Sequence, residues 1–362
     1  MDAALAEIAE RIRAAAGERR PLRIRGGGSK DFYGERLEGE LLDTRVLQGV
    51  VNYEPSELVV TVRAGTPLAQ LEQVLASAGQ SLPFEPPHFG PGATVGGMVA
   101  AGLSGPARAS VGAVRDYVLG LNLVNGRGEH LVFGGQVMKN VAGYDVSRLM
   151  AGAMGTLGVL TEVSLKVLPV PPAHATLRFE LAQAEALQRL NAWGGKPLPL
   201  NASRWLAGGA TGTLFLRLRG AVAAVESACR TLGGERVDDA AAGADWQACR
   251  EQQLPWFGED AGRDLWRLSV PQTAPVLDLP EPPLVEWHGA QRWVRVAPGD
   301  GAHVREAALA AGGHATLFRT ARADATHRMT PLAPALATIH ERLKQQFDPA
   351  GIFNRGRLYA QP

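Results

Sequence analysis

The sequence is poor in cysteine. Its 362 residues include two, Cys229 and Cys249, twenty positions apart. A single disulfide between them stays possible, but two cysteines cannot form the framework of a small secreted domain. Because no Cys-x-x-Cys pair occurs, the sequence carries no signature of an iron–sulfur cluster or a zinc ribbon.

A surplus of charge and a long apolar run are also missing. The formal net charge is +1, which argues against a nucleic-acid-binding protein and against an electrostatic membrane binder. No segment approaches the length of a membrane span, and the first residues, MDAALAEIAERIR, lack the apolar centre of a signal peptide. These absences predict a cytoplasmic protein, with peripheral membrane attachment through a partner left open.

Two common nucleotide-binding signatures are absent as well. No Gly-x-Gly-x-x-Gly leads from a strand into a helix, and no Gly-x-x-x-x-Gly-Lys-Ser/Thr occurs, so neither a Rossmann site nor a P-loop is indicated. Apolar residues make up 46% of the chain, which is enough for the cores of two ordinary domains.

Glycine is abundant, and it concentrates in one segment. Residues 90–105 read GPGATVGGMVAAGLSG, with glycine at six of sixteen positions and no acid, base or large aromatic. Such a segment offers bare backbone, which another group can approach closely and whose N–H groups can bind an anion. A cradle for a phosphorylated cofactor and a tight packing turn are both compatible with this segment taken alone.

Local patterns predict the elements around this segment. Thr66 is expected to cap a helix that starts at Pro67 and ends at Gly79. Asn125-Gly126 is expected to form a type I′ turn, and Asp145 to cap a helix over 146–150. The other expected elements are a helix over 3–16 and strands over 22–25, 58–64, 117–124, 129–133 and 159–167, the last one half-buried.

A proline-rich stretch marks the clearest domain boundary. Residues 168–172 read LPVPP, and three prolines in four positions are expected to form a stiff connector outside any sheet. Strands over 213–218 and 292–296 and a helix over 221–232 then predict an α+β domain with an antiparallel sheet. The predicted organisation is residues 1–172, then 173–330, then a C-terminal helix and tail over 331–362.

Four glycine-bearing segments follow one another along the chain. They are Arg25–Lys30 (RGGGSK), Gly90–Gly105, the pair KNVAGYD (139–145) and MGTLGVLT (154–161), and NRGR (354–357). One glycine loop is weak evidence for a ligand. Four of them in order, with strands between, are hard to explain by packing alone.

These segments resemble those of the FAD-linked oxidases of the vanillyl-alcohol oxidase type, which have the PCMH-type flavin fold. RGGGSK, PGATVGG and GTLGVLTE appear in the order and spacing of that family, over residues 20–172 and the C-terminal tail. The resemblance implies an α+β fold, in which FAD lies extended between two α/β subdomains of an FAD domain and a cap domain follows. Related tails read Asn-Pro-Gly, whereas this chain has Arg355 in place of the proline.

The resemblance also implies which residues hold FAD. The loop at 26–29 would bind the diphosphate, the segment at 92–97 would complete that grip, and 155–159 would lie near the ribityl chain or the ring. The expected cofactor residues are Arg25, Gly26, Gly27, Gly28, Ser29, Lys30, Pro91, Gly92, Ala93, Thr94, Gly96, Gly97, Gly155, Thr156, Gly158, Val159 and Asn354. Many relatives attach FAD through a His in the diphosphate loop or a Cys elsewhere. Because this loop has no His and both cysteines lie outside the FAD domain, we expect non-covalent FAD.

Longer stretches are most similar to the FAD-binding E subunits of bacterial glycolate oxidases. They are LPFEPPHFGPGATVGGMVAAGLSGP (82–106), VRDYVLG (114–120), residues 133–169 and the tail DPAGIFNRGRLY (348–359). The resemblance implies a complex that oxidises glycolate to glyoxylate. Its other members would be a sister flavoprotein and a cysteine-rich iron–sulfur subunit that passes electrons onward.

The sequence marks the substrate site less clearly than the cofactor site. Oxidation of a 2-hydroxy acid needs a base for the hydroxyl proton and a cation for the carboxylate. His314 as base and Arg319 as clamp are the candidates, with Lys139 and Tyr144 as others, although each of the four could equally be an ordinary polar or packing residue. Trp205, Trp287 and Trp293 are interpreted as core aromatics. The eight histidines are scattered without a paired motif, so we expect no metal.

Three functions therefore remain open. The first is an FAD-binding subunit of a glycolate oxidase complex. The second is a self-sufficient FAD-dependent D-2-hydroxy acid dehydrogenase, for which the sequence does not distinguish D-lactate from glycolate as the substrate. The third is a non-catalytic structural or electron-relay subunit.

Overall fold

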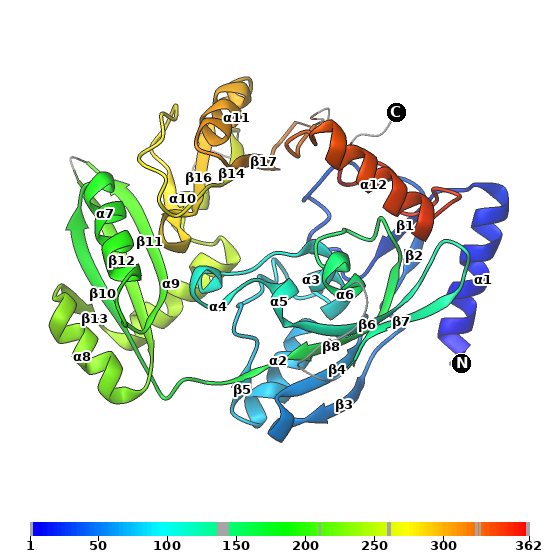
Figure 1. Cartoon of the computed structure of the whole chain (residues 1–362), viewed down its shortest axis with the longest axis horizontal. Coiled ribbons are helices and arrows are strands. Elements are labelled where there is room, and N and C mark those ends of the chain that lie inside the picture. The colour runs from blue at the N-terminus through cyan, green and yellow to red at the C-terminus, as the bar shows by residue number, and fades with distance from the viewer. Residues whose placement is uncertain are drawn as a thin grey trace. The chain divides into compact units, whose positions relative to one another are not determined.

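The structure is a computed structural model that describes residues 3–135, 145–209, 211–258, 262–322, 325 and 327–359. Its chain divides into two compact units (Figure 1). The first comprises Met1–Leu103, Ala113–Pro169 and Pro331–Pro362, and the second comprises Ser104–Gly112 and Val170–Thr330. The segment 104–112, which directly follows the glycine-rich stretch, thus belongs with the second unit, whereas the sequence placed it in the first.

The N-terminal part of the first unit forms a small layer of its own. Helix α1 (Ala3–Glu18) buries Ile8 and Ile12 against strands β1 (Leu22–Arg25) and β2 (Glu40–Asp43). The two strands are parallel, and Phe353 from the tail joins their core. The predicted helix and first strand are confirmed.

A five-stranded antiparallel sheet is the centre of the first unit. Its strand order is β3 (Val50–Glu54), β4 (Val59–Arg63), β8 (Val159–Lys166), β6 (Val118–Val124) and β7 (His130–Gly134). The prediction of a half-buried strand over 159–167 is wrong in one respect. Because β8 is central, Thr161 and Ser164 on its polar face are buried too, and the Ser164 hydroxyl is hydrogen-bonded to that of Thr61 at 2.8 Å.

Short elements surround this sheet. They are the 3₁₀ turn Pro55–Glu57, α2 (Leu68–Ser77), β5 (Gln80–Ser81), α3 (Val95–Ala101), α5 (Val114–Tyr117), α6 (Val146–Met150), β9 (Leu168–Pro169) and α12 (Pro334–Phe347). Asp145 caps α6 as predicted, by accepting the N–H of Arg148. Strand β9 pairs with β5, so Pro169 does lie in a two-stranded ladder, contrary to the expectation for this stretch.

Thr66 does not cap α2 as predicted. Its buried hydroxyl accepts the N–H of Gly49 at 3.0 Å and faces the carbonyl of the same residue at 3.3 Å. The N-cap of α2 is Pro67, which makes no side-chain bond to the helix. Thr66 instead ties α2 to the turn before β3. The predicted helix end at Gly79 is confirmed, since Gly79 has φ +66° and donates to Ala76.

The predicted type I′ turn at Asn125-Gly126 is also wrong. Residues 125–129 form a longer loop, because Val124 pairs with His130. The Asn125 side-chain oxygen accepts the N–H groups of Arg127 and Glu129, at 2.9 and 3.0 Å. Gly126 is needed for a different reason: a Cβ there would lie 2.6 Å from a carboxylate oxygen of Asp348.

The second unit is built on an eight-stranded antiparallel sheet, which confirms the predicted α+β cap. The strand order is β13 (Glu235–Val237), β10 (Ala173–Leu181), β12 (Thr211–Gly220), β11 (Leu200–Gly208), β15 (Leu284–Glu286), β16 (Gln291–Val296), β14 (Asp264–Ser269) and β17 (His314–Arg319). The predicted strands over 213–218 and 292–296 lie within β12 and β16.

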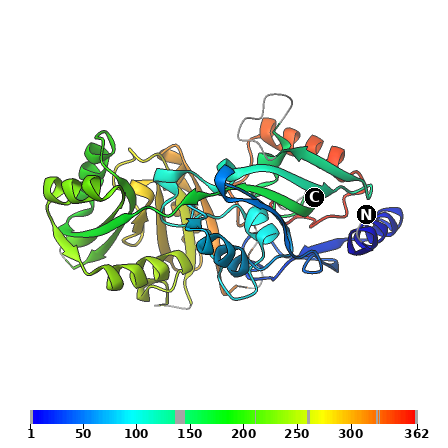
Figure 2. The same cartoon turned by 90° about the horizontal axis from the view of Figure 1, so that it is seen from below.

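Helices cover this sheet on both sides (Figure 2). Helices α7 (Gln183–Gly194) and α8 (Val222–Leu232) pack on one face of β10 and β12. Helix α9 (Asp239–Glu251) lies on the other face, where Trp246 donates to Thr176. Helix α11 (Gly301–Ala310) covers β14, β16 and β17. The short helices α4 (Arg108–Val111) and α10 (Pro255–Gly258) complete the unit.

Both cysteines are free, so the disulfide that the sequence left possible does not form. The Cys249 thiol donates to Glu286 at 2.9 Å. Burial raises the pKa of both groups. The three tryptophans interpreted as core residues are buried, with exposed fractions of 4–6%.

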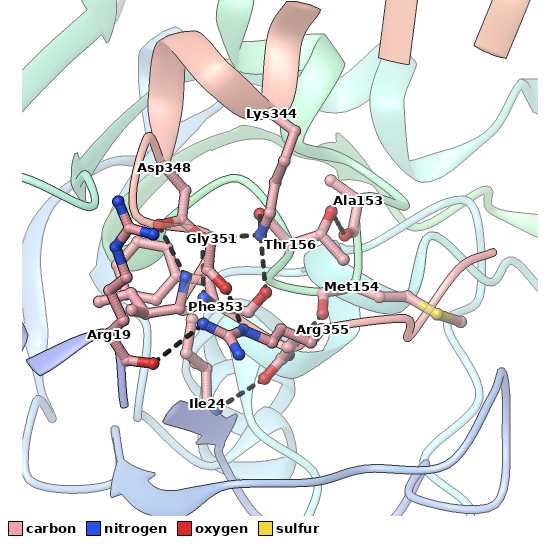
Figure 3. Close-up of polar contacts among 12 residues, drawn as sticks. Arg19, Ile24, Ala153, Met154, Thr156, Lys344, Asp348, Gly351, Phe353 and Arg355 are labelled. Carbon is pink, nitrogen blue, oxygen red and sulfur yellow. Dashed lines mark hydrogen bonds and ion pairs between the residues drawn. The ribbon is translucent and has the colours of Figure 1, made fainter. Parts of the chain in front are cut away.

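The C-terminal tail is held to the first unit by a buried ion pair (Figure 3). The Asp348 carboxylate accepts the ammonium group of Lys344 at 2.7 Å and the N–H groups of Ile352 and Phe353 at 3.0 and 2.7 Å. Lys344 also donates to the carbonyls of Thr156 and Phe353, each at 2.7 Å. Burial lowers the pKa of Lys344, and the charge of Asp348 opposes that shift.

Replacing Asp348 with Asn tests this anchor. The substitution leaves the Lys344 ammonium buried without its counter-charge, which costs about 3–5 kcal/mol of unfolding free energy. Urea denaturation followed by circular dichroism measures the change. The control is Asp278→Asn, because the Asp278 side chain is 95% exposed and its contact with His303, at 3.5 Å, lies at the surface. Equal urea midpoints for D348N and the wild type would contradict the assignment.

Candidate functional site

Two of the glycine segments touch each other in the first unit. The loop after β1 lies against the segment that leads into α3. A Cβ on Gly27 would fall 1.3 Å from the carbonyl oxygen of Gly92, and one on Gly26 would fall 2.3 Å from the Thr94 hydroxyl oxygen. No side chain fits in either place. The glycines therefore serve close packing, and this packing brings two stretches of bare backbone together.

The first loop presents unused backbone donors. Within the described residues, the N–H groups of Gly27, Gly28 and Ser29 have no hydrogen-bond partner. All three residues are partly exposed, so a ligand can reach them. Successive N–H donors in a turn form a concavity that binds anions.

The charged residues of this loop pack against its own backbone. Gly28 has φ +76°, and a Cβ there would lie 2.0 Å from the guanidinium of Arg25. Arg25 is itself paired with Asp31 at 2.7 Å. The Lys30 ammonium donates to the carbonyl of His88 at 3.1 Å and to the Ser29 hydroxyl at 3.3 Å. One net positive charge remains on the loop, which favours an anionic ligand.

The second segment is fixed by its own contacts. The Thr94 hydroxyl caps α3 by accepting the N–H of Gly97 at 3.2 Å. Gly96 donates to the carbonyl of Ala64 at 2.7 Å, and a Cβ on Gly96 would lie 2.7 Å from the Ala64 side chain. Gly96 thus lets α3 pack directly on the end of β4.

Three cavities collect most of the predicted cofactor residues. The first, of about 90 Å³, is lined by Arg25, Gly26, Gly27, Gly28, Ser29, Lys30, Thr94, Gly97 and Asn354. The second, of about 70 Å³, is lined by Gly26, Gly96, Gly97, Gly155, Gly158 and Asn354. The third, of about 380 Å³, is lined by Thr156 and Asn354 among the predicted residues. Pro91, Gly92, Ala93 and Val159 line none of these three.

Asn354 borders all three cavities, but its amide is committed to the protein. With φ +38°, it accepts the N–H of Ile24 at 2.8 Å and donates to the carbonyl of Met154 at 2.7 Å. It thereby joins β1 to the third glycine segment. Arg355, which stands where related tails have proline, is exposed and donates to the carbonyls of Gly351 and Arg19 (Figure 3). That departure therefore leaves the contacts of Asn354 intact.

Arg357, which was not among the expected cofactor residues, also lines these cavities. Its side chain is buried and donates to the carbonyls of Lys30, Asp31 and Glu35. It lines both the first and the third cavity. The only signal for it was its place in the fourth glycine-bearing segment.

The third cavity has a basic, partly apolar lining. Arg115, Arg148 and Lys344 contribute cationic side chains, and His340 and Tyr359 contribute rings. Burial, and secondarily the charge of Tyr33, raise the pKa of Tyr359. None of the described lining residues of this cavity is an Asp or a Glu. Lys344 is paired with Asp348 and Arg148 with Asp145, so Arg115 and Arg357 contribute most of the remaining positive charge, and the lining suits a flat ring system.

The predicted substrate residues lie in the second unit, at the two ends of one strand. His314 begins β17 and Arg319 ends it, so about 16 Å separates their Cα atoms. Neither side chain lines one of the three cavities. His314 is exposed at the strand end, while partial desolvation and the charges of Arg267 and Arg108 lower its pKa, and burial lowers the pKa of Arg319.

Some expectations fall on residues outside the description. Lys139, Tyr144 and the KNVAGYD segment up to residue 144 are not among the described residues. In the part of the chain that is described, no group of three or more His, Cys, Asp or Glu side chains is placed to hold a metal ion. No helix formed by those residues is both long and apolar enough to cross a membrane.

Comparison with known proteins agrees with the geometry of the first unit. Residues 3–134 match the family described as an FAD binding domain. The chain is 48% identical to the glycolate oxidase subunit GlcE of Escherichia coli (strain K12), over 98% of this chain and 97% of that protein. It is 32% identical to the glycolate oxidase subunit GlcD of Bacillus subtilis (strain 168), over 47% of this chain and 37% of that protein.

A solved structure extends the likeness to the whole fold. An alkyldihydroxyacetonephosphate synthase superimposes with a TM-score of 0.66 at 15% identity, over 96% of this chain and 74% of that one. The match to the FAD binding domain family and the likeness to a glycolate oxidase subunit give FAD as the cofactor, and the backbone N–H groups of residues 27–29 fit its diphosphate.

The close contact of the two loops predicts the effect of one methyl group. Gly27→Ala places a Cβ against the Gly92 carbonyl and must push the loops apart, so purified G27A should carry less than about a tenth of the wild-type FAD, as judged from the ratio of flavin to protein absorbance. Gly17→Ala is the matched control, since nothing lies within 4 Å of a Cβ at that position in α1. Wild-type FAD content in G27A would refute the cradle.

Proposed function

We propose that this chain, which belongs to the GlcE family of FAD-linked glycolate oxidase subunits, is the FAD-binding subunit of a complex that oxidises glycolate to glyoxylate. One observation carries the proposal: in the described part of the chain, the N–H groups of residues 27–29 have no hydrogen-bond partner, and these residues line one cavity together with Thr94 and Gly97 of the second glycine segment. A relative that is alike over its whole length, and is named a glycolate oxidase subunit, supports the choice of reaction.

The cavities suggest how the chain holds FAD. The diphosphate takes the N–H groups of Gly27, Gly28 and Ser29, with the charge of Lys30 nearby. The residues that would hold the rest of the cofactor are Gly155 and Gly158 of the second cavity and the lining of the third, which has a volume of about 380 Å³. The attachment is non-covalent, and acid-precipitated protein that kept its yellow colour would contradict this.

In the proposed reaction, the cofactor accepts the electrons, and the protein binds the substrate and accepts its proton. Bound FAD supplies a two-electron acceptor for the hydride on the α-carbon of the acid. The chain must bind the carboxylate, accept the hydroxyl proton and exclude water from the site. His314 remains our candidate for the proton acceptor, because its lowered pKa favours the neutral imidazole. Arg319, at the other end of β17, remains the candidate for the carboxylate clamp.

A subunit fits these features better than a self-sufficient enzyme does. The sequence has no cysteine motif for an electron carrier, so the electrons leave through other polypeptides. The partners we propose are a sister flavoprotein and an iron–sulfur subunit, on the cytoplasmic side of the membrane and attached to it through the complex. Nucleic acid is not among the proposed partners.

Two alternatives make different predictions. A self-sufficient 2-hydroxy acid dehydrogenase would be favoured if anaerobic glycolate or D-lactate bleached the flavin of the isolated chain at once. A structural or relay subunit would be favoured if the chain purified without flavin bands, or if flavin-free variants left complex activity intact.

Co-expression separates the leading proposal from both alternatives. The isolated chain should reduce an artificial dye with glycolate at less than about a hundredth of the rate of the complex, because binding and electron exit need the partners. The complex carrying G27A should lose activity with the flavin, whereas the complex carrying G17A should not. Full dye reduction by the isolated chain would sink the proposal.

A further inference from the structure

The loop over residues 82–90 is strained, and the proposed function does not use it. It runs from β5 to the second glycine segment and reads LPFEPPHFG. Glu85 has φ +47° and Phe89 has φ +54°, a region that bulky L-residues rarely adopt. Such strain persists where surrounding contacts over-determine the backbone, and it concentrates at functional sites. The contacts around Phe89 therefore indicate what the loop does.

The end of this loop packs on the RGGGSK loop. The Lys30 ammonium lies 5.6 Å from the centroid of the Phe89 ring, and the Phe32 ring makes an edge contact with Phe89 at the same centroid distance. A Cβ on Gly90 would lie 3.8 Å from the Cβ of Ser29, which is an ordinary van der Waals contact. The strained turn thus lies against the residues that follow the N–H groups assigned to the diphosphate.

The same turn holds the Lys30 ammonium from a second side. The carbonyl of His88 accepts a hydrogen bond from this ammonium at 3.1 Å, and the Ser29 hydroxyl accepts one at 3.3 Å. A lysine ammonium is otherwise a strongly hydrated point charge on a flexible stem. Because Lys30 is half-buried and contacts a carbonyl, a hydroxyl and a ring, its charge has a defined position.

Helix α2 anchors the turn through an acid. The Nε2 atom of His88 lies 3.0 Å from a carboxylate oxygen of Glu72, and the two side chains are only 16% and 29% exposed. Further back in the loop, the fully buried Phe84 ring packs on Tyr117 with a centroid distance of 5.2 Å. These contacts can hold Phe89 in its unfavourable conformation.

We propose that Phe89 is a positioning residue for the diphosphate of FAD, and that it acts by holding the Lys30 ammonium beside the first cavity. The inference rests on the proposed function, in which the N–H groups of residues 27–29 take the diphosphate. Lys30 is one of the residues that line the first cavity, whereas Phe89 and His88 are not. Phe89 therefore acts on the ligand through the lysine.

Fixing this charge before FAD binds raises the affinity for the diphosphate. A lysine that becomes ordered only on binding loses side-chain entropy, and that loss weakens the complex. A cation already held over an aromatic ring has lost this freedom beforehand. The other cation of the RGGGSK loop, Arg25, is paired with Asp31 at 2.7 Å. Lys30 therefore supplies much of the attraction of this loop for an anion.

Isothermal titration of the full chain, stripped of flavin, with ADP tests the inference, because ADP carries the diphosphate and lacks the flavin ring. Phe89→Leu keeps an apolar side chain and removes the π face, so F89L should bind ADP about threefold or more weakly. Phe89→Trp keeps a π face and should bind ADP as the wild type does. Lys30→Met should weaken ADP binding by about tenfold or more.

The double variant K30M/F89L shows whether Phe89 acts through Lys30. If it does, the leucine has no charge left to release, and K30M/F89L should bind ADP as K30M does. A threefold loss that persists in the K30M background would mean that Phe89 shapes the loop itself, and would overturn the inference. Wild-type affinity for ADP in F89L or in K30M would overturn it too.

Two controls separate positioning from damage to the fold. Riboflavin has no phosphate, so F89L and K30M should bind it as the wild type does, and an equal loss for riboflavin and ADP would contradict the proposed role. Phe133→Leu is the matched variant, because it also removes a half-buried ring in an edge contact, with Phe347 at 6.3 Å. F133L should keep wild-type affinity for ADP. Thermal unfolding checks each variant, and Phe89→Met replaces F89L if F89L does not fold.

Failure of this inference is distinguishable from failure of the proposed function. A wild-type chain that binds FAD and supports glycolate oxidation in the complex, while F89L binds ADP equally well, overturns the positioning role alone. A wild-type chain that purifies without FAD and binds none overturns the proposed function, and this inference with it. FAD binding by the wild type is therefore measured before any variant is titrated.

Discussion

The contact between Gly27 and Gly92 is the constraint on which the cofactor site depends. It brings the two loops so close that a Cβ on Gly27 would fall 1.3 Å from the Gly92 carbonyl oxygen. Backbone packed in this way has no side-chain atoms to satisfy the N–H groups of Gly27, Gly28 and Ser29. An anionic ligand can satisfy them instead. Packing and binding, which seemed to be rival interpretations of the glycines, are two consequences of one arrangement.

The rest of the first unit holds these loops in position. Asn354 joins the end of β1 to the carbonyl of Met154, and Arg357 joins the tail to the residues that follow the first loop. The tail itself is fixed by the buried pair of Lys344 and Asp348. Residues more than three hundred positions apart therefore shape one cavity. In the second unit, the turn Trp287–Gly289 holds the segment 104–112 through a hydrogen bond from the Trp287 indole N–H to the carbonyl of Gly105.

Much of the fold and of the cofactor site could be predicted from the sequence, because the signals that mark them are local. Glycine loops, strand alternation and helix ends are local signals, and the elements expected from them were found. The errors arose where a local signal had a distant partner. Thr66 serves Gly49 rather than its helix, and Gly126 makes room for Asp348 rather than for a tight turn. Of the tail side chains that line the cavity, Asn354 was expected, whereas Arg357 had no signal beyond its place in the fourth glycine-bearing segment.

The second unit shows the same limit more sharply. His314 and Arg319 were paired because they are near in sequence, and β17 places them at its two ends. Arg108 follows the glycine segment and looks like part of the cofactor domain, yet its guanidinium stacks on Trp287 of the second unit. Only the folded chain brings together groups that are so far apart in sequence.

Competition for the stripped cofactor site tests the central claim most directly. Acid treatment should release the flavin, and the refolded chain should then rebind FAD. If backbone N–H groups that hold the diphosphate dominate affinity, ADP should displace FAD at far lower concentration than riboflavin, which has no phosphate. Flavin that stays with the precipitated chain, or riboflavin that competes as well as ADP, would contradict the account.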